Sequence, residues 1–220
     1  MKAGFAPFSE KVTLLGGGEL TPASVSDCLT RAPNLVVCDG AAARALEIGL
    51  MPQRVVGDMD SLDDATRARL DPAILHEIAE QESTDFEKAL STVEAPLILG
   101  AGFMGGRLDH ELACYNALVR HAGQPCILVG ERDICFHAPK PVSLMLPVGM
   151  RVSLFPMAEV VVDGAGLEWP LDRLRLAPWG RVGTSNRAVA ERVEIAPNGH
   201  GLLVILPRAG LDAAIAALAG

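Results

Sequence analysis

Residues 54–61 read RVVGDMDS, and this stretch decides the class of fold. Arg54–Val56 has the apolar character of a strand that is covered on both faces, and Gly57–Ser61 continues it as an acidic loop. Leu35–Cys38 runs in the same way into the loop Asp39–Ala41. A short apolar strand that ends in a polar loop and leads into a helix is the building unit of a parallel α/β sheet.

The same alternation of strand and helix extends over the first half of the chain. We expect buried strands at Val12–Leu15, Leu35–Cys38, Arg54–Val56, Leu97–Leu99 and Ile127–Val129. We expect helices at Pro22–Arg31, Ala41–Leu50, Asp63–Leu70, Thr84–Val93 and Arg107–His121. This pattern predicts a mainly parallel sheet with helices on both sides.

The rhythm changes after about Cys135, where short β-type runs follow one another. These runs are Val142–Leu146, Val152–Phe155, Val160–Val162, Leu167–Leu171, Val193–Ile195 and Leu202–Leu206. Turn residues separate them, and Asn198–Gly199 resembles a hairpin turn. We therefore predict an α/β domain over residues 1–133 and an all-β sandwich over residues 134–220, closed by a short helix at Leu211–Leu218.

Composition limits the classes of function. The chain has 220 residues, a net charge of -8, about half apolar residues and only 4% aromatic ones. An acidic chain without a basic cluster is not expected to bind nucleic acid through its phosphates. No apolar stretch approaches the roughly 20 residues that a membrane helix needs. The first twenty residues have no basic segment followed by an apolar run, so no secretory signal is expected.

The five cysteines are odd in number and widely spaced, and they contain no C-x-x-C pair. This usage argues against a disulfide framework or a zinc ribbon and favours reduced, buried thiols. We expect a soluble, cytoplasmic protein.

Acidic residues stand where the predicted strands end. Asp39 follows one strand, and Asp58 and Asp60 follow the next with the spacing that puts two side chains on the same side of an extended backbone. Ligands of open parallel sheets bind outside the carboxyl ends of the strands, and hard carboxylate oxygens without thiols favour Mg²⁺. An ordinary acidic turn before the next helix remains an alternative, because D-x-D is common in loops.

Two further segments carry polar residues into helices. Thr84 with Glu87 fits a capping box, so Thr84 and Asp85 could simply begin a helix, although a helix N-terminus also suits a phosphate site. The glycine-rich loop 100–106 leads from a strand to a helix, where Arg107 could contact phosphate. Asp109, Ala113 and Asn116 share one face of that helix, and His110 points elsewhere. Gly16–Gly18 could touch a nucleotide or form a tight turn.

Taken in order, these segments resemble thiamine pyrophosphokinase. The resemblance is carried by Asp39–Ala41, Gly57–Ser61, Thr84–Phe86 and Gly105–His110 with Asn116, and in the second half by Gly166–Leu171 and Gly183–Asn186. It spans roughly residues 35 to 190. The sequence departs from the commonest pattern at Glu80–Gln81–Glu82, where Asp-rich versions are usual, so the roles of Glu80 and Glu82 stay open.

The resemblance implies an α/β domain, a β-sandwich and a homodimer with active sites between subunits, acting on thiamine and ATP with Mg²⁺. By similarity, the catalytic and metal-binding residues would be Asp39, Asp58, Asp60 and Asp85. Gln81, Arg107, Asp109 and Asn116 would line the substrate cleft. Trp169, Ser185 and Asn186 would hold the thiamine rings from the partner subunit. Tryptophan is the best aromatic face for the cationic thiazolium, although Trp169 could equally be a core residue of the sandwich.

The chemistry that the resemblance implies is attack of the thiamine hydroxyl on the β-phosphorus of ATP, with AMP leaving. Three other readings stay open on the residues. One is a pyrophosphokinase acting on another alcohol, such as a hydroxymethylpterin. Another is a metal-dependent phosphohydrolase, and the third is a thiamine or nucleotide sensor without catalysis. Retention of all four aspartates favours an enzyme.

Overall fold

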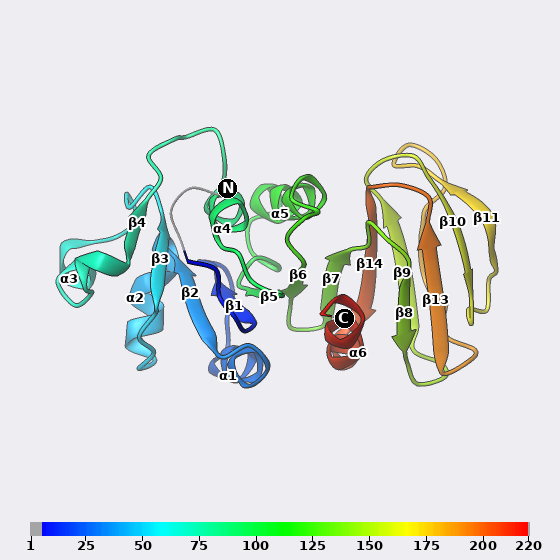
Figure 1. The fold of residues 1–220 in the computed structure, drawn as a ribbon, viewed down its shortest axis with the longest axis horizontal. Coiled ribbons are helices and arrows are strands. Elements are labelled where there is room, and N and C mark those ends of the chain that lie inside the picture. Colours follow the sequence, from blue (N-terminus) through cyan, green and yellow to red (C-terminus); the bar gives the residue numbers. More distant parts are fainter. Residues whose placement is uncertain (1–5, 220) are drawn as a thin grey trace. The chain divides into compact units, whose positions relative to one another are not determined.

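The computed structural model describes residues 6–219 (Figure 1). Residues 1–5 and 220 lie outside it. The predicted α/β domain over residues 1–133, the predicted sandwich over residues 134–220 and the expected absence of a secretory signal in the first twenty residues each include some of these positions. The chain divides into two compact units. Unit 1 comprises Met1–Ala117 and Leu128–Gly130, and unit 2 comprises Leu118–Ile127 and Glu131–Gly220. The division falls within α5 (Leu108–Arg120) and β6 (Cys126–Val129), and the predicted boundary after residue 133 stays a prediction.

Unit 1 is an α/β layer structure built on a parallel sheet. Its strands are β1 (Val12–Leu15), β2 (Asn34–Cys38), β3 (Arg54–Gly57), β4 (Leu75–Glu77) and β5 (Ile98–Ala101). They pair in the order β5-β1-β2-β3-β4, and each of these pairs is parallel. Every residue of β1 and β5 is buried, as expected for strands that are covered on both faces. The predicted parallel sheet is confirmed.

The order of these strands reverses once, and this reversal assigns the helices to the two faces. The helices are α1 (Pro22–Arg31), α2 (Asp39–Glu47), α3 (Asp64–Arg67) and α4 (Asp85–Thr92), with a 3-10 turn at Pro72–Ile74. From β1 to β4 the chain moves outward in one direction, and α4 then carries it back to β5 beside β1. Right-handed crossovers therefore put α1 and α2 on one face and α4 on the other, as Figure 1 shows. The switch point lies between β1 and β5, where such sheets bind ligands at the carboxyl ends of their strands.

Unit 2 consists of two antiparallel sheets and a closing helix. Its elements are β7 (Asp133–His137), β8 (Val142–Met145), β9 (Arg151–Pro156), β10 (Val160–Ala165), β11 (Leu171–Leu176), β12 (Gly183–Arg187), β13 (Arg192–Pro197), β14 (Leu202–Pro207), a 3-10 turn at Arg208–Gly210 and α6 (Leu211–Leu218). One sheet has the order β12-β9-β14-β7 and the other β11-β10-β13-β8. Alternate residues of β8 and β13 are buried, including Val193 and Ile195 of β13, which is the pattern of a sandwich.

Several local predictions need correction. The predicted strand Leu167–Leu171 is wrong, because Leu167 makes only an isolated bridge to Ala188 and β11 begins at Leu171. The predicted hairpin at Asn198–Gly199 is also wrong, since β13 and β14 belong to different sheets. The strands β4, β7 and β12 were not predicted. Within residues 6–219, no helix combines the length and the apolar composition that crossing a membrane requires.

Candidate active site

A pocket of about 620 Å³ lies in unit 1, lined at the switch point of the sheet by residues that follow β1 and β5. The loop Gly16–Gly18 follows β1 and packs directly on the loop after β5, with Gly16 N donating to Ala101 O (2.8 Å) and Gly18 N donating to Gly102 O (3.0 Å). A Cβ atom on Gly18 would lie only 2.6 Å from the Gly102 carbonyl oxygen. The glycines therefore allow two backbones to approach and also leave peptide groups on the pocket wall.

Three carboxylates gather beside this pocket. Asp39, Asp58 and Asp60 each offer an oxygen, and these oxygens all lie within 4.8 Å of one another. Asp39 is buried at the start of α2, and its two oxygens accept hydrogen bonds from Gly40 N (2.7 Å) and Met59 N (2.8 Å). The second bond fixes the D-x-D loop, in which Met59 has the left-handed φ of 65°. The acids of the loop therefore lie around one point. The extended backbone expected between Asp58 and Asp60 is wrong, because the left-handed Met59 turns the chain there.

Gly57 is required by this arrangement. A Cβ atom at this position would lie 2.4 Å from Cγ of Asp39, so a larger residue would displace the buried carboxylate. Burial is the first cause that raises the pKa of Asp39 to about 6, and the nearby Asp85 carboxylate adds to it. A buried carboxylate with a raised pKa beside other carboxylates favours binding of a cation.

Lys88 is a residue of the site that the sequence reading missed. Its side chain is only 2% exposed, and its Nζ donates to Asp58 Oδ2 (2.8 Å) and lies 3.5 Å from Asp85 Oδ1. The hydrogen bond from Lys88 is the main cause that lowers the pKa of Asp58. Burial works to lower the pKa of Lys88, but the two carboxylates outweigh it and raise that pKa. The sequence signal that could have indicated this role is that Lys88 follows Asp85 by three residues, which puts both side chains on one face of the helix.

The other residues of this segment have definite places. Thr84 is the N-cap of α4 and accepts from Glu87 N (3.3 Å), as predicted. Gln81 Nε2 donates to Asp58 Oδ2 (3.0 Å). Glu80 accepts hydrogen bonds from the backbone of its own turn, from Glu82 N and Ser83 N. Asp85 lines the pocket but lies outside the three-carboxylate group, so its role as a metal ligand stays a prediction.

The start of α5 differs from the expected arrangement. Arg107, His110, Glu111 and Cys114 line the pocket, whereas Asp109 and Asn116 do not. His110 does lie on a different helix face from Asp109 and Asn116, as predicted, but the face of His110, Glu111 and Cys114 is the one that lines the pocket. Asp109 is exposed and pairs with Arg107, its Oδ2 lying 2.6 Å from Nη2.

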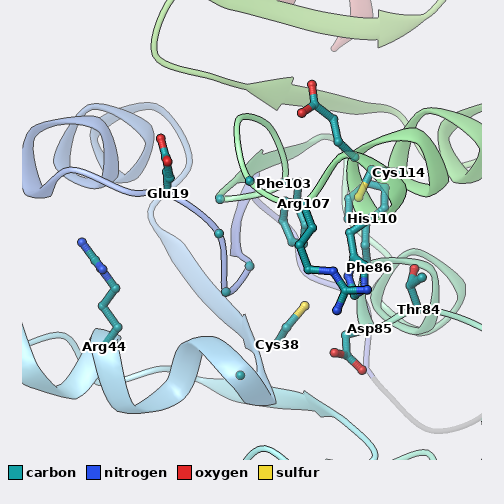
Figure 2. A pocket seen from close by; sticks show the side chains of 17 residues that line it. Glu19, Cys38, Arg44, Thr84, Asp85, Phe86, Phe103, Arg107, His110 and Cys114 are labelled. Carbon is teal, nitrogen blue, oxygen red and sulfur yellow. The ribbon is translucent and has the colours of Figure 1, made fainter.

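Figure 2 shows how this pocket is arranged. Arg44 and Glu19 lie at one end, and Thr84 and Asp85 lie at the other (Figure 2). Arg107 extends toward the side where Cys38 and Asp85 lie. Cys38 and Cys114 contribute thiols to the wall, and burial raises the pKa of Cys114 to about 12. Acidic and basic side chains therefore both stand on the pocket wall, with Glu19 and Arg44 at one end and Asp85 at the other.

The donor set fits a hard divalent cation. Each of the three carboxylates can offer an oxygen to one point, and none of the metal-binding atoms of this group is a thiol or an imidazole. Such an oxygen set is the one that Mg²⁺ and Mn²⁺ prefer. Asp39, Asp58 and Asp60 are the residues that would hold the ion.

The predicted thiamine-binding residues lie in unit 2. Trp169 is 53% exposed, so the alternative that it is a core residue of the sandwich is excluded. Ser185 is exposed and has a φ of 63°. Asn186 is buried, and its side chain bonds to the backbone of Trp169. Their predicted contact with a ligand stays a prediction.

The fold and the site together define a class of protein. It has one α/β unit and one all-β unit, with an acidic, glycine-lined pocket at the switch point of the parallel sheet. Sequence comparison gives a family. The model described as "Thiamin pyrophosphokinase, catalytic domain" matches residues 25–128. "Thiamine pyrophosphokinase 1" of Oryza sativa subsp. japonica is 30% identical over 163 residues, covering 66% of this chain and 62% of that protein. The protein of the same name from Arabidopsis thaliana is 25% identical, covering 77% and 71%.

Solved structures agree with these matches. The thiamin pyrophosphokinase of Geobacillus thermodenitrificans has a TM-score of 0.74 and 25% identity, covering 90% of this chain and 96% of that one. The Candida albicans enzyme, at 16% identity, has the same TM-score and supports the fold alone. All three comparisons indicate the thiamine pyrophosphokinase family. The chain spans less than two thirds of the Oryza sativa relative's length.

Proposed function

We propose that this protein is a thiamine pyrophosphokinase, which transfers the terminal diphosphate of ATP to the hydroxyl of thiamine and releases AMP. The observation that carries this proposal is the convergence of Asp39, Asp58 and Asp60 beside a glycine-lined pocket at the switch point of the sheet. Proteins named thiamine pyrophosphokinase among the sequence relatives and the structural neighbours support the choice of reaction.

Mg²⁺ is the proposed metal, with Asp39, Asp58 and Asp60 as its ligands and Asp85 as a further candidate. When bound, it would neutralise charge on the triphosphate, which is the main requirement of phosphoryl transfer. The chain's own residues supply positioning. Gly16–Gly18 and Arg107 line the same pocket. Because Gly16 N and Gly18 N already donate to Ala101 O and Gly102 O, the guanidinium of Arg107 is the group better suited to phosphate oxygens.

The thiamine end of the reaction is assigned to unit 2. Trp169 presents an exposed indole that can stack on a flat cation. Gln81, Asp109, Asn116 and Ser185 remain proposed contacts of the substrates. The proton of the thiamine hydroxyl needs an acceptor, and an aspartate of the cluster is the proposed base.

We further propose a cytoplasmic homodimer. All five cysteines are buried thiols, which is typical of a reducing compartment. Leu108 and Leu112 are 69% and 55% exposed one turn apart on α5, and exposed apolar pairs of this kind are often covered by a partner. Analytical ultracentrifugation would test the dimer directly, and a monomer at micromolar concentration would contradict it.

The test of function is incubation with ATP, Mg²⁺ and thiamine, with AMP and thiamine diphosphate measured together. Equal amounts of both products are expected, and Asp58→Asn should abolish them. Asp172→Asn is the matched control, because Asp172 is exposed on β11 and belongs to no part of the site. Release of AMP or phosphate without thiamine diphosphate would refute the proposal in favour of hydrolysis or another acceptor. Binding of thiamine without turnover would favour a sensor.

A further inference from the structure

The side chain of Asn186 is committed to backbone groups. Its Oδ1 accepts from Trp169 N (3.1 Å) and from Arg187 N (2.9 Å), and its Nδ2 donates to Trp169 O (2.8 Å). Asn186 is only 6% exposed. A carboxamide oxygen has two lone pairs, so both acceptor positions of this side chain are already used. The amide group thus bonds both the backbone N–H and the backbone C=O of Trp169, which lies 17 positions away in the sequence.

The backbone around Asn186 is shaped to make this contact possible. Ser185 has a φ of 63°, a left-handed conformation that is unfavourable for a non-glycine residue. Its N–H donates to Ser153 Oγ (3.0 Å), and the pairing of β12 with β9 shifts register between Gly183 and Asn186. In the final stretch of β12, Asn186 is buried between two exposed neighbours, Ser185 and Arg187.

The segment that carries Trp169 is joined to this strand on both sides. Glu168 N donates to Arg187 O (3.0 Å), and the Glu168 carboxylate forms an ion pair with the Arg187 guanidinium. Val189 N donates to Gly166 O (2.8 Å). Gly166 has a φ of +82°, and a Cβ atom there would lie 2.2 Å from the carbonyl oxygen of Arg192. The backbone of residues 166–169 is therefore fixed, while the Trp169 indole remains half exposed.

We infer that Asn186 is a positioning residue, which fixes the backbone of Trp169 so that the indole is held ready for a flat cationic ligand, and that Asn186 does not bind the ligand itself. This differs from the expectation that Asn186 contacts thiamine directly. Holding an aromatic face in place before binding reduces the ordering cost of association. The identity of the ligand rests on the proposed function, whereas the fixing of Trp169 does not.

Trp169 can be made its own reporter, because the chain has only two tryptophans. Trp179 is 76% exposed, so Trp179→Phe should leave the fold intact and make Trp169 the single emitter. In this background, Asn186→Ala should lower the fluorescence anisotropy of Trp169, because the indole gains local motion. Asn186→Asp keeps the two acceptor positions but sets a carboxylate oxygen against the Trp169 carbonyl oxygen in place of the donated bond, so it should also lower the anisotropy below that of the Trp179→Phe parent. Asn198→Ala is the matched control, since Asn198 Oδ1 also accepts from a backbone N–H, that of Val161 (2.9 Å), without touching Trp169.

Thiamine kinetics supply the second readout. Asn186→Ala should raise KM for thiamine on the order of ten-fold with little change in kcat, the size expected when about 1.4 kcal/mol of binding is lost. In a Trp169→Ala background, the same substitution should have almost no further effect, because Asn186 acts through Trp169. Unchanged anisotropy in Asn186→Ala would overturn the inference. So would a full additional loss of thiamine affinity in the Trp169→Ala background, which would indicate direct contact. If thiamine proves not to be a substrate, the anisotropy series still decides whether Asn186 positions Trp169.

Discussion

Replacing Lys88 with methionine should destabilise unit 1 strongly, because it removes one partner of a buried ion pair and leaves the other in place. Lys88 is 2% exposed and Asp58 is 12% exposed in their side chains, and their charged atoms are 2.8 Å apart. Breaking such a pair on one side typically costs about 3–5 kcal/mol. The second partner, Asp85, adds little, because it lies 3.5 Å away and is 40% exposed.

We therefore expect a loss at the lower end of that range, about 3 kcal/mol. For a chain of this size, each kcal/mol lowers Tm by about 2–4 °C, so Lys88→Met should melt about 6–12 °C below the wild type. Differential scanning calorimetry at neutral pH measures this directly. The exposed Lys140 provides the matched control, and Lys140→Met should change stability by less than about 0.5 kcal/mol.

A double-mutant cycle separates the ion pair from the packing of the lysine stem. Asp58→Asn combined with Lys88→Met should lose clearly less than the sum of the two single variants, with an interaction of about 1–3 kcal/mol. If the two losses simply add, or if Lys88→Met melts within 1–2 °C of the wild type, the charge argument is refuted. Lys88 would then be a lysine whose stem fills space and whose charge is of little consequence.

The remaining predictions concern other positions of the two units. Gly57→Ala should weaken Mg²⁺ binding measured by calorimetry, because the new Cβ would meet Asp39 Cγ at 2.4 Å; unchanged affinity would contradict this. Burial lowers the pKa of His137 from 6.5 to about 4, so folding favours its neutral form. As pH drops below 6.5 the unfolded chain binds a proton that the folded one does not, and the free energy of unfolding should fall by up to about 1.4 kcal/mol per pH unit. His137→Gln should lack this slope in urea titrations at pH 7 and pH 5. The raised pKa of Cys114, about 12, predicts slow reaction with iodoacetamide at pH 8, and labelling at the rate of a free thiol would count against it.

The sequence predicted the parallel sheet well because its strands carry a strong local signal. The strands β1, β2, β3 and β5 are runs of buried apolar residues, and such runs are visible without any tertiary information. The missed strand β4 has only three residues and no fully buried one. β12 reads Gly-Thr-Ser-Asn-Arg, and it is a strand only because β9 pairs with it. Both β4 and β12 depend on pairing with a neighbouring strand, and a local stretch of sequence carries no information about that pairing.

The site was predictable where it depends on strand ends and less so where it depends on side-chain partners. The convergence of Asp39, Asp58 and Asp60 follows from the rule that parallel strands end at one edge. The burial of Lys88 between two acids does not follow from any motif, since a lysine one turn into a helix is usually solvated. The bonding of the Asn186 side chain to both backbone groups of Trp169 is likewise invisible in sequence, because Trp169 lies 17 residues away.

The buried lysine follows from the topology of unit 1. The chain reverses direction after β4, so α4 returns on the face of the sheet opposite to α1 and α2 and begins at the carboxyl edge. Its first turn must therefore face the aspartates of the β2 and β3 loops, which adds Asp85 to an edge that already holds three acids. Four carboxylates at one edge repel each other unless cationic charge is supplied. Lys88, one turn into the same helix, supplies a single positive charge from within the fold. The cluster that remains is still negative, and this residual charge is what a divalent cation arriving with a phosphate substrate would neutralise.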